Sequence, residues 1–311
     1  MRTFRRYCVD VQYVGSKFSG WIGAPREHRN GHPPGVVEAI GKALTKFVGE
    51  NNYKNLKGSS RTDAGVHAVC NRFHVDICRT GRAGAAEDLA ARPAYDPAVV
   101  VRAMNFYLSS HNLSILRARA VDPEFNALKN AKARSYTYRL AYNPFKGQKD
   151  AFAQPWLLDQ NSMWMLDSNL DIQAMRAAAQ LFVGEKDFSY VRNAGCQALT
   201  PVRAVSALTV RDYNSGQDNE DLHAAMLMGP LRLLTVHITA NAFLYRMVRN
   251  IVAVLVKVGQ GELSVEEVRA LIEQGDRTLG PAPAPAHGLF LVNVHFDEES
   301  EWDVQAVNSL S

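Results

Sequence analysis

The sequence has few cysteines and no pattern that would bring them together. No Cys-x-x-Cys pair occurs, and no spacing of cysteine and histidine is typical of a zinc site. This scarcity argues against a disulfide framework and a structural metal, and it favours a reducing compartment inside the cell. The four cysteines are Cys8, Cys70, Cys78 and Cys196.

Long apolar runs are also missing. No run approaches the roughly 18–20 apolar residues that a membrane-spanning helix needs, so no membrane partner is expected. The Arg-rich start MRTFRRY passes almost at once into strand-like sequence, which leaves little room for a removable presequence. The sequence therefore predicts an intracellular protein of the cytoplasm, with the nucleus and the mitochondrion as alternatives.

A strong charge of either sign is absent as well. Lys and Arg number 35 and Asp and Glu number 31, which gives a formal net charge of +4 over 311 residues. This mildly basic balance is compatible with nucleic acid but does not demonstrate it. Hydrophobic residues make up 47% of the chain, enough to bury the core of two domains or of one large domain.

Hydrophobic periodicity predicts strands and helices in alternation. Strands are expected at 6–14, 69–77, 113–121, 134–142, 203–211, 230–240 and 289–296, and helices at 36–48, 97–108, 171–182 and 244–258. Ser264 and Glu267 have the spacing of a capping box for one more helix. This order predicts an α+β fold with a largely antiparallel sheet, in two similarly ordered halves at 1–125 and 126–311.

The stretch GSSRTDAGVHA, residues 58–68, has no apolar periodicity. Gly58 and Gly65 permit unusual backbone geometry, so a tight loop feeding the strand at 69–77 is expected. Such a loop can present Asp63 from a rigid support into a cleft. The alternative is a structural turn in which Asp63 caps backbone amides, but Arg61 and Arg249 favour a carboxylate kept ionised for chemistry.

The helix at 244–258 carries an arginine among apolar side chains. At about 100° per residue, Arg249 projects beside Tyr245 and Val252, while the solvent-exposed stripe consists of Arg246, Asn250 and Lys257. A guanidinium in such surroundings needs a carboxylate or phosphate partner, and Asp63 is the expected one. An arginine nearby would lower the pKa of that aspartate. The alternative is a surface arginine whose stem packs on the valines.

Six motifs occur in one order along the chain. They are YVGSKFSGW at 13–21, SSRTDAGVHA at 59–68, FNA…AKARSYTYR at 125–139, LFVGEKDFS at 181–189, ANAFLYRMVRNIV at 240–252 and PAPAHGLFLV at 283–292. Together they resemble the motifs of TruA-type tRNA pseudouridine synthases, and the resemblance covers nearly the whole length. It implies two ferredoxin-like (RNP-like) halves, joined into one extended, mainly antiparallel sheet with a central RNA-binding cleft.

The resemblance also implies roles for particular residues. Asp63 is the catalytic aspartate, Arg61 helps to extract the target base, Tyr136 stacks on the uracil ring, and Arg249 pairs with Asp63. No metal, nucleotide or organic cofactor is implied. The partner is RNA, with tRNA first, and a homodimer is one of the two states that the family adopts, since bacterial members are dimers and some eukaryotic ones act alone.

The implied reaction isomerises uridine to pseudouridine after the base has been flipped out of its stack. Asp63 would attack C1′ or C6, or abstract the C2′ proton, and all three choices stay open. His67 is assigned to structure. RNA contacts are expected from eight cations and should weaken steeply with salt. These residues are Lys17, Arg26, Arg29, Arg61, Lys132, Arg134, Arg192 and Arg246.

Two rival functions remain at the level of sequence. The first is a catalytically inactive RNA-binding or chaperone protein on the same fold, which would not need the set of Arg61, Asp63, Tyr136 and Arg249. The second is an unrelated aspartate-dependent hydrolase. That enzyme would need a second carboxylate or a metal cluster near Asp63, and Asp76 and Asp187 are the loose candidates for it.

Overall fold

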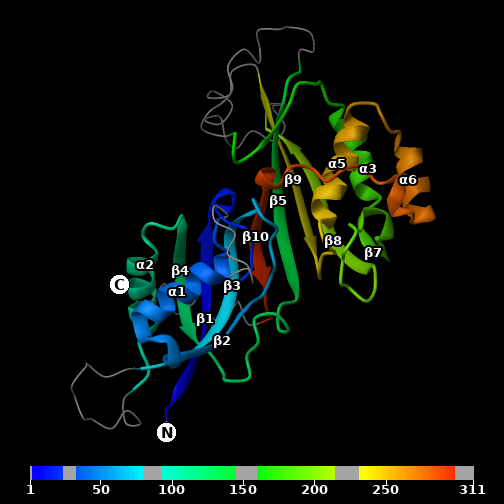
Figure 1. The fold of residues 1–311 in the computed structure, drawn as a ribbon. Helices are drawn as coiled ribbons and strands as arrows, with labels where there is room; N and C mark the ends of the chain where they lie inside the picture. Colours follow the sequence, from blue (N-terminus) through cyan, green and yellow to red (C-terminus); the bar gives the residue numbers. More distant parts are fainter. Residues whose placement is uncertain (1, 24–32, 80–92, 145–159, 214–230, 298–311) are drawn as a thin grey trace, which may run out of the picture. The chain divides into compact units, whose positions relative to one another are not determined.

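The computed structural model describes residues 2–23, 33–79, 93–144, 160–213 and 231–297. The chain divides into two compact units, of which unit 1 comprises 1–132 with 291–311, and unit 2 comprises 133–290. The sequence placed its division after residue 125. That division into functional halves stays a prediction, and the two compact units are described one at a time (Figure 1).

Unit 1 has the element order β1-α1-β2-β3-α2-β4, followed much later in the chain by β10, which belongs to this unit from Leu291 onward. Its strand order is β4-β1-β3-β10, with β2 paired to β3. The pairs of β1 with β3, β1 with β4 and β2 with β3 are all antiparallel. The strands are β1 (Phe4–Tyr13), β2 (Tyr53–Gly58), β3 (His67–Cys78), β4 (Leu113–Ala120) and β10 (Leu289–His295).

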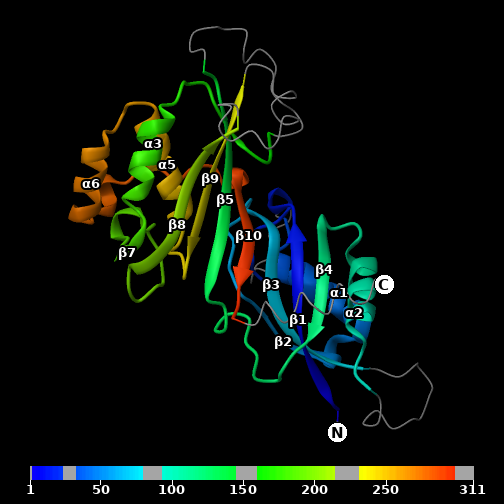
Figure 2. The same cartoon turned by 180° about the vertical axis from the view of Figure 1, so that it is seen from behind.

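Two helices, α1 (Val36–Val48) and α2 (Pro97–Leu108), pack on this sheet, and the views in Figures 1 and 2 show them from opposite sides. Asp96 caps α2 by accepting a hydrogen bond from the Ala98 amide, and Pro97 takes the first helical position, where no amide proton is needed. Five consecutive residues of β1, from Tyr7 to Val11, are buried, as are Ile40 and Leu44 of α1. Short 3-10 turns lie at Gly15–Lys17 (η1) and Glu50–Asn52 (η2).

Unit 2 repeats the strand-helix-strand-strand-helix order with β5, α3, β8, β9 and α5. Its strand order is β5-β9-β8-β7, antiparallel throughout, and β6 pairs with β5 in parallel. The strands are β5 (Ala133–Tyr142), β6 (Trp164–Leu166), β7 (Gly184–Asp187), β8 (Val202–Asp212) and β9 (Arg232–Ala240).

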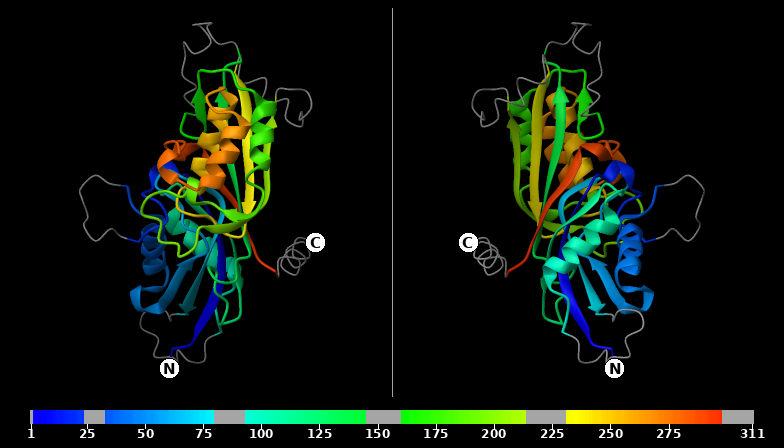
Figure 3. Two further views of the ribbon diagram at one scale, coloured as in Figure 1. Left: turned by 90° about the vertical axis from the view of Figure 1, so that its right-hand side faces the viewer. Right: turned by 90° about the vertical axis from the view of Figure 1, so that its left-hand side faces the viewer.

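The helices of unit 2, α3, α5 and α6, gather on one side of its sheet, as both views of Figure 3 show. The buried sheet face is aromatic and aliphatic, with Tyr138, Leu140, Leu234 and Val236 almost fully buried. The helices are α3 (Ile172–Gln180), α5 (Met247–Gly259) and α6 (Val265–Gln274), and 3-10 turns lie at η5 (Ser189–Val191), η6 (Arg277–Leu279) and η7 (Ala286–Gly288).

The two units confirm the predicted α+β class with mainly antiparallel strands. Within the strand-helix-strand-strand-helix order of each unit, the last of the three strands lies between the other two, as β1-β3-β2 and as β5-β9-β8, which is the pairing of a ferredoxin-like half. The capping box at Ser264 and Glu267 is also confirmed, with the Glu267 amide 3.1 Å from the Ser264 hydroxyl.

Three short strands, β2, β6 and β7, were not predicted, and α5 begins at Met247 rather than at 244. The sequence was also wrong about Asn250, which it placed on the solvent-exposed stripe of α5. Asn250 is buried, and its side-chain amide donates to the Val191 carbonyl at 2.8 Å. A polar residue read as solvent-exposed from helical spacing is here a hydrogen-bonded part of the core.

Candidate active site and RNA-contact residues

The Asp63 loop connects β2 to β3 in unit 1. The sequence predicted that this loop leads into the strand that is now β3, but not that a strand precedes it. The loop turns through Gly65, whose φ of 82° lies in the left-handed region that favours glycine. The Val66 amide donates to the Asp63 carbonyl at 3.2 Å, which closes the turn. Asp63 is half-buried and Arg61 is exposed, so the carboxylate stands at the surface of a hydrogen-bonded turn.

A preceding segment, residues 13–21, holds this loop in place. The Trp21 amide donates to the Thr62 carbonyl at 2.9 Å, and the Gly65 amide donates to the Phe18 carbonyl at 3.4 Å. The Gly15 amide donates to Nδ1 of the buried His67 at 3.2 Å. That contact gives His67 the structural role expected from the sequence.

The aromatics of the segment 13–21 lie in the core of unit 1. Tyr13, Phe18 and Trp21 are all buried, and the ring of Tyr13 packs edge-on against Phe18 with 6.1 Å between centroids. Glycines allow the close packing, since a Cβ on Gly58 would lie 2.2 Å from the Trp21 indole nitrogen. Because these rings are buried, they form a hydrophobic lid over the turn rather than a surface on which bases could stack.

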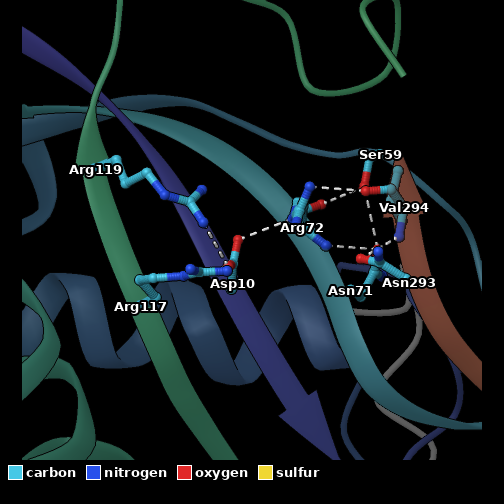
Figure 4. A network of polar contacts seen from close by, with 8 residues as sticks. All are labelled: Asp10, Ser59, Asn71, Arg72, Arg117, Arg119, Asn293 and Val294. Atoms are coloured by element: carbon cyan, nitrogen blue, oxygen red, sulfur yellow. Dashed lines mark hydrogen bonds and ion pairs between the residues drawn. The ribbon is translucent and has the colours of Figure 1, made fainter. Parts of the chain in front are cut away.

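A polar network that the sequence did not reveal reaches the same loop (Figure 4). Asn71 is fully buried on β3, and its side chain bonds Ser59, Ser60 and Tyr13. The next residue, Arg72, contacts Asp10 of β1 at 3.1 Å and donates to the Val294 carbonyl of β10 at 2.7 Å.

Asp10 is the anionic centre of this network. Besides Arg72, it contacts Arg117 at 3.0 Å and Arg119 at 3.1 Å, and only 1% of its side chain is exposed. A buried carboxylate needs such cationic partners, because isolated burial of its charge would be very costly. The network thereby ties the strands β4, β1, β3 and β10 of unit 1 together.

In unit 2, Tyr136 lies on β5 and is 6% exposed. Its ring meets Phe243 edge-on, with 5.1 Å between centroids. Two residues further on, Tyr138 donates its hydroxyl to the Pro285 carbonyl at 2.8 Å, and burial raises its pKa. The two tyrosines therefore lie on one sheet face, and aromatic and Pro-rich segments of the same unit pack against them.

Arg249 lies on α5 and is half-buried. Its Nε donates to the Ala284 carbonyl at 2.6 Å, and the Ala284 amide donates back to the Arg249 carbonyl at 3.2 Å. This reciprocal pair fixes the guanidinium against the Pro-rich segment 280–288. The neighbouring His287 has a lowered pKa, chiefly because it is buried and to a smaller degree because of the charge of Arg249.

Asp63 belongs to unit 1, whereas Tyr136 and Arg249 belong to unit 2. The pairing of Arg249 with Asp63 stays a prediction, as does the shared cleft.

The residue before α5, Arg246, has an unusual backbone. Its φ of 58° places a non-glycine residue in the left-handed region, and its guanidinium lies 4.9 Å from the ring centroid of Tyr245, which is 39% exposed. Such a conformation costs about 1–2 kcal/mol and is found mostly where the surrounding structure enforces it. Arg246 and Tyr245 thus form a cation–aromatic pair at the start of the helix that carries Arg249.

The other predicted RNA contacts differ in their surroundings. Arg134 is buried and donates to the Asn241 carbonyl at 2.8 Å, and burial lowers its pKa. Arg192 donates to the Cys196 and Ala198 carbonyls at 3.0 and 2.6 Å. These two arginines therefore hold strand ends and loops of unit 2, and any contact that they make with RNA stays a prediction.

Of the remaining predicted RNA contacts, two are exposed lysines and two lie outside the described residues. Lys17 is exposed on η1, and Lys132 pairs with Asp297 at 2.7 Å while its side chain stays 60% exposed. Arg26 and Arg29 lie outside the described residues.

Asp76 and Asp187, the two candidates for the second carboxylate of a hydrolase, both make structural contacts. Asp76 pairs with Arg6 at 2.6 Å and accepts from Asn55 at 2.6 Å. Burial alone would raise the pKa of Asp76, but the hydrogen bonds from Arg6 and Asn55 outweigh it and lower the pKa. Asp187 caps the Ser189 amide at 2.7 Å. Neither residue has the character of a second catalytic carboxylate.

Within the described part of the chain, no group of three or more His, Cys, Asp or Glu side chains is placed so that it could hold a metal ion. No helix among the described residues is both long enough and apolar enough to span a bilayer.

The family model and the known proteins that match this chain all point to one family. A model of the tRNA pseudouridine synthase family matches residues 178–297. The tRNA pseudouridine synthase A of Neisseria gonorrhoeae is 35% identical over 292 residues, 94% of this chain and 92% of the relative. The enzyme of that name from Maricaulis maris is 31% identical, covering 94% and 98%.

A human relative, tRNA pseudouridine synthase-like 1, is 36% identical over 300 residues, which cover 93% of this chain and 89% of the relative. Bacterial and human proteins thus align along nearly the whole of this chain, which carries the Asp63 loop in one unit and Tyr136 and Arg249 in the other. The chain belongs to the tRNA pseudouridine synthase A family.

Proposed function

We propose that this protein converts specific uridines of tRNA to pseudouridine, with Asp63 as the catalytic carboxylate and no cofactor. The observation that carries the proposal is the placement of Asp63 within RTDAGVHA. It lies on a turn that backbone hydrogen bonds close and that the segment 13–21 holds. A half-buried carboxylate on a fixed support is what an aspartate-dependent reaction needs.

The reaction is an isomerisation, so its atoms balance without a second substrate. The C1′–N1 bond of the uridine breaks, the uracil turns, and C5 forms a bond to C1′ while C5 loses a proton and N1 gains one. Asp63 attacks C1′ or C6, or it removes the C2′ proton, and each of these steps requires the ionised carboxylate. The uridine must first leave its stack, at a cost of a few kcal/mol.

Other residues take supporting roles in this proposal. Arg61, which is exposed two residues before Asp63, occupies the space that the flipped base leaves and contacts nearby phosphates. Tyr136 stacks on the extruded uracil. Arg249, fixed by the Ala284 carbonyl, keeps Asp63 ionised and oriented.

The proposal is tested on tRNA made by transcription, which carries no modified bases. Purified protein is incubated with a mixture of these transcribed tRNAs in the absence of nucleotides and cofactors. Pseudouridine is then mapped by chemical adduct formation and sequencing. Discrete marked uridines are the expected result. Binding of tRNA without any pseudouridine would instead identify an inactive RNA-binding protein on this fold.

Salt dependence tests the RNA surface. Because phosphate contacts release counterions, affinity for tRNA should fall steeply with salt, with a logarithmic slope of about −0.7 to −0.9 per phosphate contacted. Lys17→Gln should weaken binding to all tRNAs alike and reduce the slope by about one contact. The matched control is Lys42→Gln, an exposed lysine of α1 that pairs with Glu38 at 2.6 Å. A salt slope near zero for the wild type would contradict the assignment.

The same proposal includes a homodimer acting in the cytoplasm. The four cysteines, all within the described residues, are free thiols, which suits a reducing compartment. Sedimentation of the purified protein measures its state of assembly, and a monomer at micromolar concentration would remove the dimer from the proposal.

A further inference from the structure

We propose that Asn71 is a positioning residue that fixes Asp63 through the hydroxyl groups of Tyr13 and Thr62. The inference rests on the proposed function in one respect, which is that Asp63 carries the chemistry. Asn71 lies on β3, downstream of the loop, and is fully buried. Its side-chain hydrogen bonds go to Ser59, Ser60, Arg72 and Tyr13, and in this proposal it does not contact the substrate.

The side chain of Asn71 uses both its acceptor and its donor groups. Its Oδ1 accepts from the Ser59 hydroxyl at 3.3 Å and from the Arg72 amide at 2.8 Å. Its Nδ2 donates to the Ser60 carbonyl at 3.0 Å and to the Tyr13 hydroxyl at 3.4 Å. Aspartate lacks the donors and leucine lacks both kinds of group, so only an amide of this size makes all four bonds.

Tyr13 connects Asn71 to Thr62, the residue that directly precedes Asp63. The hydroxyls of Tyr13 and Thr62 lie 2.8 Å apart, and the Thr62 side chain is buried. The Thr62 carbonyl is held separately by the Trp21 amide at 2.9 Å. Ser59, Ser60 and Thr62 are thus anchored on the side that precedes Asp63, and the Val66 amide closes the turn on the other side.

The support behind Asn71 is stiff. Its neighbour Arg72 is 4% exposed, contacts Asp10 and donates to Val294 (Figure 4), so this part of β3 is tied to the strands on both of its sides. A rigid strand, a buried amide and two hydroxyls therefore form a continuous path to the catalytic loop. Since a displacement of about 1 Å at a reacting group can cost on the order of 10²-fold in rate, this path bears on turnover.

The decisive variants are Thr62→Val, which removes the hydroxyl at nearly constant shape, and Thr62→Ser, which keeps it. Thr62→Val is expected to lower kcat by about 10- to 100-fold while leaving the Kd for tRNA within a few-fold. Thr62→Ser should restore most of the turnover. If Thr62 had only a structural role, both variants would have a lower melting temperature, and their kcat values would not differ from each other in this way.

Asn71→Leu and Tyr13→Phe test the rest of the path. Each should lower kcat, and Tyr13→Phe combined with Thr62→Val should cost no more than the larger single change, because both break one interaction. Asn105→Leu is the matched control in the same unit, since its side chain bonds Ile115 of β4 rather than the loop. It should lose stability but keep kcat at a temperature where it is folded.

Amide exchange gives a readout that is independent of activity. In Thr62→Val the Val66 amide, which bonds the Asp63 carbonyl, should exchange faster than in wild type and in Asn105→Leu. If the wild type makes no pseudouridine, the proposed function is overturned. Faster exchange of the Val66 amide in Thr62→Val would even then support the positioning path. An active wild type with unchanged kcat and exchange in Thr62→Val would overturn the inference alone.

Discussion

Asp63→Asn is expected to abolish pseudouridine formation, with a loss of at least about 10³-fold in kcat. The amide has nearly the shape of the carboxylate, so the turn and its backbone bonds should survive. It carries no charge and has little nucleophilicity or basicity, and any of the three steps open to Asp63 would therefore fail. The Kd for tRNA should change by no more than a few-fold, since phosphates supply most of the affinity.

The measurement is single-turnover conversion of a modified-base-free tRNA, followed together with filter binding of the same RNA. Asp122→Asn serves as the control, because Asp122 is exposed in unit 1 and accepts from the Glu124 amide at 2.7 Å, a bond that asparagine can also make. Its activity should equal that of the wild type. Appreciable turnover by Asp63→Asn would show that another group carries the chemistry.

Elements with local signals could be predicted from the sequence. Asp96 and Pro97 start α2, and Ser264 and Glu267 start α6, because a cap needs only residues within one turn of the helix. The strand β3 was recognised from the alternation of Phe73, Val75 and Ile77, all of which are buried. The short β2, with its mostly polar sequence YKNLKG, offered no such pattern.

Asn71 was not identified from the sequence as a residue that supports the loop. It has the same parity along β3 as Phe73, Val75 and Ile77, so the alternation itself places an amide on the strand face that carries these buried apolar side chains. A buried amide must find hydrogen-bond partners, and this requirement was the available signal. Its partners, among them Tyr13, lie up to 58 residues away, and no local rule could name them.

Contacts made by charged side chains were the hardest to foresee. Spacing on α5 indicated that Arg249 needs a partner, but not that the Ala284 carbonyl would be one. The same spacing placed Asn250 in solvent, whereas it bonds Val191 in the core. In both cases the partner lies outside the α-helices and β-strands, Ala284 in the Pro-rich segment and Val191 in the 3-10 turn η5, and the path of such segments depends on tertiary packing rather than on periodicity.

Gly20→Ala is expected to lower kcat by on the order of 10²-fold and to lower the melting temperature by several degrees. Gly20 has a φ of +93°, which an L-residue rarely adopts. A Cβ there would lie 2.6 Å from the Thr62 carbonyl oxygen and 3.0 Å from the carbonyl carbon of Asp63. These are backbone atoms and cannot rotate away, so the loop itself must shift.

Gly23→Ala provides the matched control, because a Cβ at Gly23 would meet nothing within 4 Å. It should keep the kcat and the melting temperature of the wild type within error. The comparison separates a displaced Asp63 from a general loss of glycine, since both substitutions add one methyl group to the same connecting segment. If Gly20→Ala folded and turned over tRNA as the wild type does, the segment 13–21 would not hold the loop that carries Asp63, and the positioning path through Thr62 would lose its backbone anchor at Trp21.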